Sequence, residues 1–555
     1  MFLRKHVAKH KDREYVSYRL CRTKRDGGRV SQEVVANLGK LSPAEAERIG
    51  RQLLAIAGQE TVSEMPVEQG PAFLYGGPLV VSALMELADL RSLLEPLGRT
   101  RRRLDFVRTI TVSLCAQLLA PGSELHTYEW QEKLLPTRGP YAIPYSHFLR
   151  ALDVLADHHF EIEQGLFTRV KHLFNQQVDV VFYDLTSSYF EGVGPYGLAK
   201  RGYSRDGRGD QPQVVLGLAV TKDGYPIAYR VHPGNTVDAK TVAELADEFR
   251  RRFEVDRCLV VGDSGLLSRE NAEHLTARGL CYLMGMRAAT TRAAKDAILA
   301  TQGRLPAGQI GEVHYWPAQV ADGRSRIVLH SPGRERKTTA ILERKLTAVR
   351  PRLSQLERDV QAGKVRKGET IASRATRILV EARATPYFDI EVGDGLFVWR
   401  ERAERVDAVY EDGGKYVLET NDLAMSAKDA ALAYRQLEVA EDSMRHLKDT
   451  LQLRPMYHKT PRRVMGHIGL CVLSLFLLRL LEDRLLTAGI CKPGRGALQC
   501  ANEILAVLIH LSDREIWPRP HITPIAAAIL RAVGVTDPKA RFGDDLAALG
   551  LPTPP

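Results

Sequence analysis

Residues 178–191 (VDVVFYDLTSSYFE) begin with a nearly continuous run of hydrophobic residues. Such a run is typical of a β-strand that is buried on both faces of a sheet. Asp184 lies in the middle of this run, although an unpaired charge in a protein core is costly. The side chain of Asp184 is therefore expected to pair with an arginine, to cap a turn, or to bind a divalent metal ion.

Strand and helix patterns continue downstream of this run. Strands are predicted at residues 213–224, 226–234, 257–268 and 281–287, and helices near 238–253 and at 269–278. Lys222, Asp223 and Gly224 form a turn signal, so the first two of these strands are expected to pair with each other. Counted from Asp184, the elements follow the order β-β-β-α-β-α-β.

A second carboxylate, Asp263, lies where the chain leaves the strand predicted at residues 257–268, which is the fourth strand when the strand of Asp184 is counted as the first. Active sites of α/β proteins are found at that end of the strands. If the first and fourth strands are neighbours, Asp184 and Asp263 converge, and two carboxylates in one site repel each other unless a hard cation lies between them. Oxygen ligands without cysteine suit magnesium or manganese, so a third acidic ligand is expected.

The third candidate, Glu441, lies in residues 433–458, which are predicted to form one helix. Apolar residues recur there at spacings of three and four and are expected to form a buried stripe: Leu437, Ala440, Met444, Leu447 and Leu451. Tyr434, Glu441 and Lys448 recur every seven residues along a line beside that stripe, and Arg445 follows Glu441 by one turn. The alternative is a solvent-exposed face on which these side chains form ion pairs.

Basic residues concentrate near the N-terminus. The first forty residues carry eleven Lys and Arg against four Asp and Glu, and their alternating pattern predicts a small β-hairpin module. Arg101, Arg102 and Arg103 lie between two predicted helices of a helical region, residues 71–175. Each basic segment either contacts phosphates of a nucleic acid or forms a solvated surface.

The composition of the whole chain agrees with a polyanionic partner. The 555 residues contain 78 Lys and Arg against 67 Asp and Glu, which gives a formal charge of +11. Seven scattered cysteines without metal-binding spacing indicate a reducing, cytoplasmic location. No membrane segment is expected, because the longest apolar stretch, Ile468–Leu478, is too short to span a bilayer and is predicted to lie in a buried helix.

The ordered set of motifs resembles the DDE transposases of bacterial insertion sequences, over about residues 10–490. The matching fragments are YDLTSSYFE, GYSRDGRGD, GLAVTKDGYPI, HPGNTVD and VVGDSGL, together with the spacing of Tyr434, Glu441 and Lys448. Related transposases carry the helix signature Y-(2)-R-(3)-E-(6)-K. This chain has Leu437 where that signature has arginine, so Arg445 is the candidate to replace it.

The resemblance implies a function and a set of roles. It implies a transposase that binds the inverted-repeat ends of its insertion sequence as a homodimer, cleaves them and joins them to double-stranded target DNA. Asp184, Asp263 and Glu441 would hold two Mg²⁺ (or Mn²⁺) ions for two-metal phosphoryl transfer. The expected DNA-binding residues are Tyr434, Arg445, Lys448, Arg101, Arg102, Arg103 and Arg205. The alternatives are a structure-specific metal-dependent nuclease and a non-catalytic DNA-binding descendant of a transposase.

The resemblance also implies an α/β fold with an RNase H-like core. The core would be interrupted by an insertion domain between the second aspartate and the glutamate, and preceded by the hairpin module and the helical domain. The expected divisions are residues 1–70, 71–175, 176–290 (first part of the core), 291–409 (insertion), 410–490 (second part, with the Glu441 helix) and 491–555 (a helical tail).

Overall fold

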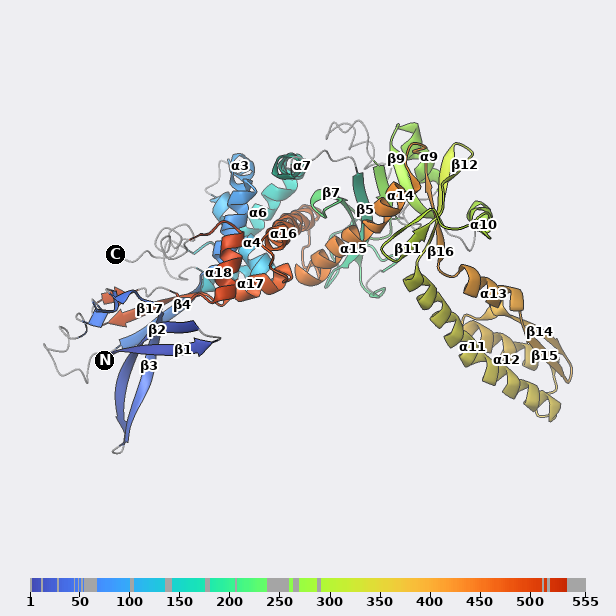
Figure 1. Cartoon of the computed structure of the whole chain (residues 1–555), viewed down its shortest axis with the longest axis horizontal. Helices are drawn as coiled ribbons and strands as arrows, with labels where there is room; N and C mark the ends of the chain where they lie inside the picture. The colour runs from blue at the N-terminus through green and yellow to red at the C-terminus, as the bar shows by residue number, and fades with distance from the viewer. Residues whose placement is uncertain are drawn as a thin grey trace. The chain divides into compact units, whose positions relative to one another are not determined.

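The computed structural model divides the chain into two compact units. Unit 1 comprises residues 1–178, 184–236 and 439–555, and unit 2 comprises residues 179–183 and 237–438. The structure describes residues 2–536 except 11–12, 27–28, 44, 48, 51–52, 54–66, 100–103, 135–141, 175–179, 205–206, 237–258, 263–268, 287–290, 512–513 and 517–519. Figure 1 shows the helices and strands of the chain with their labels.

Unit 1 begins with an antiparallel sheet of three strands, β1 (Phe2–His10), β2 (Arg13–Asp26) and β3 (Arg29–Gly39). The strands pair in sequence order, as expected for a chain that folds back through tight turns. Leu20 and Cys21 of β2 are buried, whereas basic side chains on β1 and β2, such as Arg4 and Lys24, are exposed. The sheet therefore presents positive charge to solvent.

Helices fill most of the following region, as the three and four spacing predicts. They are α2 (Gly76–Leu87), α3 (Leu90–Leu94), α4 (Phe106–Leu119), α5 (Glu124–Trp130), α6 (Tyr145–Asp157) and α7 (His159–Phe174). The long helix α16 (Pro461–Thr487) packs against several of them, including α4 and α6. Thr460 caps α16 by accepting a hydrogen bond from the amide of Arg463, and Pro461 occupies its first turn.

Helix α16 is buried almost all round. By length and composition it could cross a membrane, yet 89% of its most apolar window is buried inside the structure, so the expected core helix is confirmed. Gly466 shows how closely it packs, because a Cβ added there would lie 2.1 Å from the carbonyl oxygen of Leu152 in α6. Only a glycine permits this approach of the two backbones.

The C-terminal region contains strands as well as helices. Helices α17 (Gly494–Asn502) and α18 (Pro524–Ala532) agree with the expected helical tail, but β17 (Leu505–Leu511) and β18 (Arg514–Ile516) do not. Strand β17 pairs with β4 (Val67–Leu74) and β18 in a separate small sheet. A continuous apolar run of seven residues such as LAVLIHL fits a strand as well as a helix, and its pairing partner decides which one forms.

The central strands of unit 1 are the second half of β5 (Val180–Tyr189), β6 (Gln213–Thr221) and β7 (Pro226–Pro233). Strands β6 and β7 form the predicted antiparallel pair, with Gly217 opposite Arg230. Strand β5 is buried along most of its length, which confirms the expectation of a strand covered on both faces.

The sheet of unit 2 contains the first half of β5 beside β8 (Leu259–Gly262) and β9 (Cys281–Met286), all three parallel. Helix α9 (Arg269–Ala277) connects β8 to β9, as predicted. The sheet continues from β9 through β16 (Lys415–Thr420), β13 (Arg324–His330), β11 (Val313–Tyr315) and β10 (Gly308–Ile310), with β12 (Gln319–Ala321) paired to β13 and α10 (Arg292–Leu299) packed on it.

A separate hydrophobic core forms within residues 332–412. Helices α11 (Pro332–Gln361), α12 (Gly368–Glu381) and α13 (Ala403–Asp412) pack with the hairpin of β14 (Phe388–Gly393) and β15 (Leu396–Glu401) (Figure 1). Leu346 and Leu353 of α11 are fully buried in this cluster. The part of the chain between the second aspartate and the glutamate thus contributes both strands to the main sheet and a body with its own core.

Candidate active site

Asp184 occupies the centre of β5, in a half-buried position between two fully buried neighbours, Tyr183 and Leu185. One of its carboxylate oxygens, Oδ1, accepts a hydrogen bond from the amide of Leu185 at 2.8 Å. That bond fixes the orientation of the side chain. A carboxylate that is half-buried on a rigid strand is oriented by the protein and still accessible, so it can hold a cation.

The parallel pairing of β5 with β8 meets the condition for Asp184 and Asp263 to converge. Phe182 of β5 is in register with Val261 of β8. Asp184 follows Phe182 by two residues, and Asp263 follows Val261 by two residues. Asp263 lies outside the described residues, so its role stays a prediction.

Glu441 lies in helix α15 (Leu437–Arg445), with an exposed side chain. The stripe predicted for this helix is buried: Leu437, Ala440, Met444, Leu447 and Leu451 are each at most 7% exposed. The part of the chain that the structure describes gives Glu441 no hydrogen bond or ion pair. Its carboxylate is therefore presented to solvent from a helix that is held firmly by its other face.

The neighbouring carboxylate, Asp442, behaves in the opposite way. It forms ion pairs with Arg479 of α16 at 2.8 Å, with Arg445 at 3.0 Å and with His446 at 3.3 Å. Partial burial raises the pKa of Asp442, but the hydrogen bond from Arg479 and the surrounding positive charges outweigh it and lower the pKa overall. Asp442 thus fastens α15 to α16, whereas the adjacent Glu441 makes no such bond within the described part of the chain.

The segment after α15 connects the Glu441 helix to the strand of Asp184 within unit 1. Ser188 donates a hydrogen bond from its hydroxyl to the carbonyl of Leu453 at 3.2 Å. The amide of Met456 donates to the carbonyl of Tyr189, and the amide of Glu191 donates to the carbonyl of Met456. These bonds join the end of β5 to the residues that follow the helix, so the elements of two candidate ligands are held together.

The expected single helix over residues 433–458 is wrong in its details. The chain forms α14 (Ala427–Arg435), a turn at Gln436, α15, and a π turn at His446–Thr450. Lys448 lies in the π turn and is half-buried. Hydrogen bonds in a π turn span five residues instead of four, so a spacing of seven no longer keeps Lys448 on the line of Glu441.

Two further predicted DNA-binding residues are described. Tyr434 packs in unit 2, where its hydroxyl lies only 2.5 Å from the position that a Cβ on Gly285 would take. Its ring is 6.0 Å from that of Tyr416. Arg445 is exposed and pairs with Asp442, so the helix-face ion pair considered for it does form. The structure does not describe Arg101, Arg102, Arg103 or Arg205.

An exposed loop with two tyrosines, Tyr196 and Tyr203, follows β5 directly. Tyr196 is 98% exposed and Tyr203 is 82% exposed, although large aromatic side chains are seldom left so open. The ammonium of Lys200 lies 5.6 Å from the ring centre of Tyr196, and Arg201 is also exposed. Proteins bind single-stranded nucleic acids with aromatic rings that stack on the bases and with nearby cationic side chains.

Whether the described ligands suit a metal ion can be judged from their donor atoms. Asp184 and Glu441 offer carboxylate oxygens, which are the ligands that Mg²⁺ and Mn²⁺ prefer. One is partly buried and oriented by a backbone hydrogen bond, and the other projects from a helix whose packing face is fixed. These residues fit hard divalent cations and offer no nitrogen or sulfur ligand.

A second cluster was missed by the sequence analysis. Glu124, His458 and His467 lie together in the interior of unit 1, with their ligand atoms within 4.8 Å of one another. Glu124 and His467 are 343 positions apart in the sequence. The three residues carry no shared spacing, so no local pattern could have revealed them.

Comparison with known proteins agrees with the motifs. The Transposase DDE domain matches residues 177–477, and the N-terminal domain of the IS1634 family transposases matches residues 3–64. No curated protein matches the chain in sequence. Among solved structures, the chain is similar to the piggyBac transposase in its synaptic complex with hairpin DNA, with 9% identity over 88% of each chain and a TM-score of 0.36. Since the domain match covers more than half of the sequence, the chain belongs to the DDE transposases of bacterial insertion sequences.

Proposed function

We propose that this transposase binds the inverted-repeat ends of its insertion sequence, cleaves them, and joins them to target DNA, with Asp184, Asp263 and Glu441 as the metal ligands. The observation that carries the proposal is the contrast on α15. Glu441 is exposed and makes no ion pair with any described residue, while the adjacent Asp442 is committed to Arg479. A carboxylate left without a partner on a well-packed helix is available to a cation.

The remaining ligands are supported by the strand register. Because Phe182 of β5 pairs with Val261 of β8, and Asp184 and Asp263 follow these two residues by two positions in the sequence, we propose that both carboxylates serve as ligands. Two Mg²⁺ (or Mn²⁺) ions bound there would supply activation of water or a DNA 3′-hydroxyl and stabilisation of the leaving oxygen. The chain's own contribution is to fix the carboxylates before DNA binds, through β5 and the packing of α15.

We propose that several further residues contact the DNA. We assign phosphate contacts to Arg445 and Lys448, which follow Glu441 by four and seven residues in the sequence. Tyr196 and Tyr203 are assigned to stacking on displaced bases, because their rings project from the loop that follows Asp184's strand. Tyr434 of α14 is assigned as a further DNA contact.

Binding of the transposon ends is assigned to the basic segments. The exposed basic side chains of the β1–β3 sheet support a role for this N-terminal module in contacting phosphates. Arg101, Arg102, Arg103 and Arg205 would add positive charge to the bound duplex. We further propose a homodimer on paired ends, an RNase H-like core interrupted by residues 291–409, and action in the bacterial cytoplasm on the nucleoid.

The test is a cleavage and strand-transfer assay on DNA that carries the element's own ends. Asp184→Asn and Asp263→Asn should each abolish cleavage and largely preserve end binding, because the loss falls on metal ligation and not on phosphate contacts. Glu438→Gln is the matched control for Glu441→Gln, since Glu438 is an exposed glutamate in the first turn of the same helix. Near-normal cutting by Asp184→Asn would contradict the assignment of that residue.

The same assay separates the transposase from its alternatives. A structure-specific nuclease would cut the ends and release them without joining. A non-catalytic DNA-binding descendant would bind the ends and cut nothing with either metal. Joined products that disappear in the Asp184 variant are the outcome expected of a transposase.

A further inference from the structure

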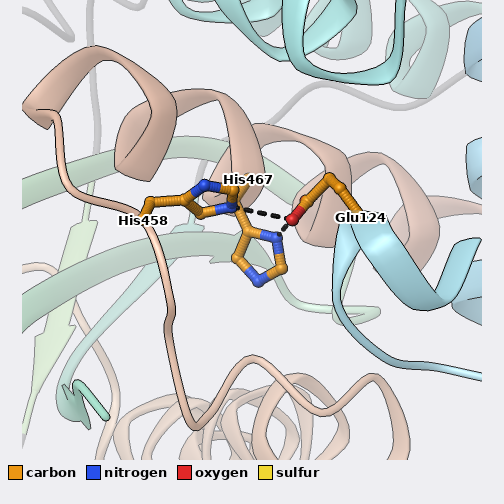
Figure 2. Close-up of side chains that lie close together, drawn as sticks. All are labelled: Glu124, His458 and His467. Carbon is orange, nitrogen blue, oxygen red and sulfur yellow. Dashed lines mark hydrogen bonds and ion pairs between the residues drawn. The ribbon is translucent and has the colours of Figure 1, made fainter. Parts of the chain in front are cut away.

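The Glu124, His458 and His467 side chains meet in the interior of unit 1 (Figure 2). Glu124 is in the first turn of α5, His467 is in the second turn of α16, and His458 lies in the segment that precedes α16. The three residues are between 5% and 9% exposed. Buried histidines and carboxylates are unusual, so their arrangement requires an explanation.

The geometry directs one ligand atom of each residue to a common centre. Glu124 Oε2 lies 3.0 Å from His458 Nε2, and Glu124 Oε1 lies 2.9 Å from His467 Nδ1. The two imidazole rings are 5.2 Å apart. The ligand atoms come from three separate segments of the chain, yet all lie within 4.8 Å of one another (Figure 2).

The donor set is that of a transition metal and not of magnesium. Two imidazole nitrogens and one carboxylate oxygen form a ligand set that zinc uses at open sites, where a water or other molecule completes the coordination. Imidazole nitrogen favours zinc, copper, iron or nickel over the hard cations that carboxylates alone select. The cluster therefore differs in chemistry from the carboxylates of Asp184 and Glu441.

A cavity next to the cluster has room for that additional ligand. Its volume is about 140 Å³, and all three side chains line it together with residues such as Ser123, Arg454 and Tyr457. One water molecule requires only about 10–15 Å³ of such space. A cation bound to the three side chains would therefore face a cavity with room for solvent and not close-packed protein.

The far side of His467 is held in place as well. Its Nε2 lies 3.9 Å from the sulfur of Cys471, and the side-chain amide of Gln117 lies 3.5 Å from that sulfur. A ligating histidine is commonly oriented through its second nitrogen, which fixes the ring and the tautomer. His467 thus already has the orientation that coordination through Nδ1 requires.

We propose that Glu124, His458 and His467 form a binding site for one zinc-class divalent cation, distinct from the metal ions of the transposition chemistry. The cation is held by Glu124 Oε, His458 Nε2 and His467 Nδ1, and a solvent molecule in the cavity completes its coordination. The protons that join the imidazoles to the carboxylate in the metal-free protein leave when the metal binds.

The site has a structural consequence. His458 ends the segment whose residue Met456 is hydrogen-bonded to Tyr189 and Glu191 at the end of Asp184's strand. Coordination would attach that segment to both α5 and α16. A bound cation would therefore fix the backbone between the Glu441 helix and the Asp184 strand, without touching DNA.

The test uses the full chain, stripped of metal with a chelator and titrated with Zn²⁺ alone. One Zn²⁺ per chain should bind to the wild type and equally to the Asp184→Asn variant, in competition with a chromophoric chelator. His458→Gln should weaken binding by more than the about 10–100-fold that loss of a residue merely hydrogen-bonded to a ligand costs. His126→Gln is the matched control, because His126 is an exposed histidine of the same helix α5 as Glu124.

Co²⁺ binding to the wild type gives a readout that does not depend on whether any variant folds. Bound at this site in the wild type, it should show the strong visible absorption of a low-coordinate ion with nitrogen ligands, and Zn²⁺ should displace it. Zinc binding that survives His458→Gln but disappears in Asp184→Asn would place the ion at the carboxylates and overturn the proposal. If the wild type bound zinc no more tightly than His458→Gln, the three side chains would form a hydrogen-bonded cluster only. That result would also overturn the proposal.

Discussion

Two regions of unit 1 use carboxylates in opposite ways. On α15 the exposed Glu441 makes no ion pair within the described part of the chain, whereas in the interior Glu124 bonds to two imidazoles at 2.9 and 3.0 Å. The first carboxylate costs little to expose and is ready for a ligand from outside. The second would be costly in isolation and is stabilised by groups of the protein itself. A carboxylate's partners, more than its position in the sequence, thus indicate what it does.

The largest expected effect follows from the contrast between Glu441 and Asp442. Glu441→Gln should lower the rate of end cleavage on the order of 10³-fold or more, the scale on which removing a single group that acts in the chemistry lowers kcat. The stability of the protein should hardly change, because the Glu441 side chain makes no hydrogen bond or ion pair with any residue that the structure describes. Single-turnover cleavage at saturating protein, with urea unfolding in parallel, measures both quantities.

Asp442→Asn is the counterpart in the same helix turn. It removes the charge that pairs with Arg479 and Arg445, so it should destabilise the protein by about 0.2–1 kcal/mol and leave cleavage within a fewfold of the parent. Comparable losses of cleavage in both variants would mean that α15 acts only through its packing, and the division of labour between the two carboxylates would fail.

The next largest effect concerns stability and the interior cluster. Glu124→Gln leaves two buried imidazoles without their carboxylate, and breaking a buried pair on one side costs about 3–5 kcal/mol. Glu161→Gln is the matched control, because Glu161 pairs with His158 at 3.1 Å on the surface and should cost less than about 1 kcal/mol. Equal free energies of unfolding for the two variants would show that burial adds nothing to the Glu124 interaction.

The same contrast explains how much the sequence could reveal. Asp184, the β6–β7 pair and the buried stripe of α15 come from local patterns, because a strand or helix imposes its period on neighbouring residues. The π turn at His446–Thr450 and the strand β17 could not be predicted, since tertiary packing decides between alternatives that the period leaves equal. Glu124 and His467 meet only through the packing of α5 against the α16 region, so no period connects them.

A third prediction tests whether the arginines between α3 and α4 serve a ligand or only solvent. Neutralising Arg101, Arg102 and Arg103 together should weaken binding to transposon ends and reduce the slope of log affinity against log salt by up to about 2.7, at about 0.9 per lost phosphate contact. Fluorescence anisotropy over a range of salt concentrations gives the slope. An unchanged slope would assign these arginines to the solvated surface.

A fourth prediction concerns the exposed rings of the loop after β5. Tyr196→Ala should weaken binding to ends that carry an unpaired flanking base by about 1–3 kcal/mol, the range for one aromatic ring stacked on a base. Binding to fully paired duplex should change little. Tyr189→Ala is not a suitable control because that side chain lies under Arg208, so Tyr457→Ala, an exposed tyrosine elsewhere in unit 1, serves instead. Equal effects on both DNAs would remove Tyr196 from the stacking role.

The smallest effect is expected where a carboxylate is paired but only partly buried. In unit 2, Arg350 of α11 donates two hydrogen bonds to Glu401 of β15, at 2.6 and 2.9 Å. The hydrogen bonding and charge of Arg350 lower the pKa of Glu401 below its ordinary 4.5. Because the folded state binds this proton less readily than the unfolded state, the stabilisation is fully present above about pH 4.5 and is lost as the pH falls through the lowered pKa.

Glu401→Gln should therefore cost about 0.2–1 kcal/mol at neutral pH and almost nothing in acid well below the lowered pKa. Urea unfolding of the full chain at the two pH values, with Arg350→Gln and the double variant to isolate the pair, measures the difference. A cost that stays constant on acidification would show that Glu401 contributes through packing and not through its charge. A cost as large as that of Glu124→Gln would mean that partial exposure does not weaken a paired carboxylate, and the distinction between the surface and interior pairs would collapse.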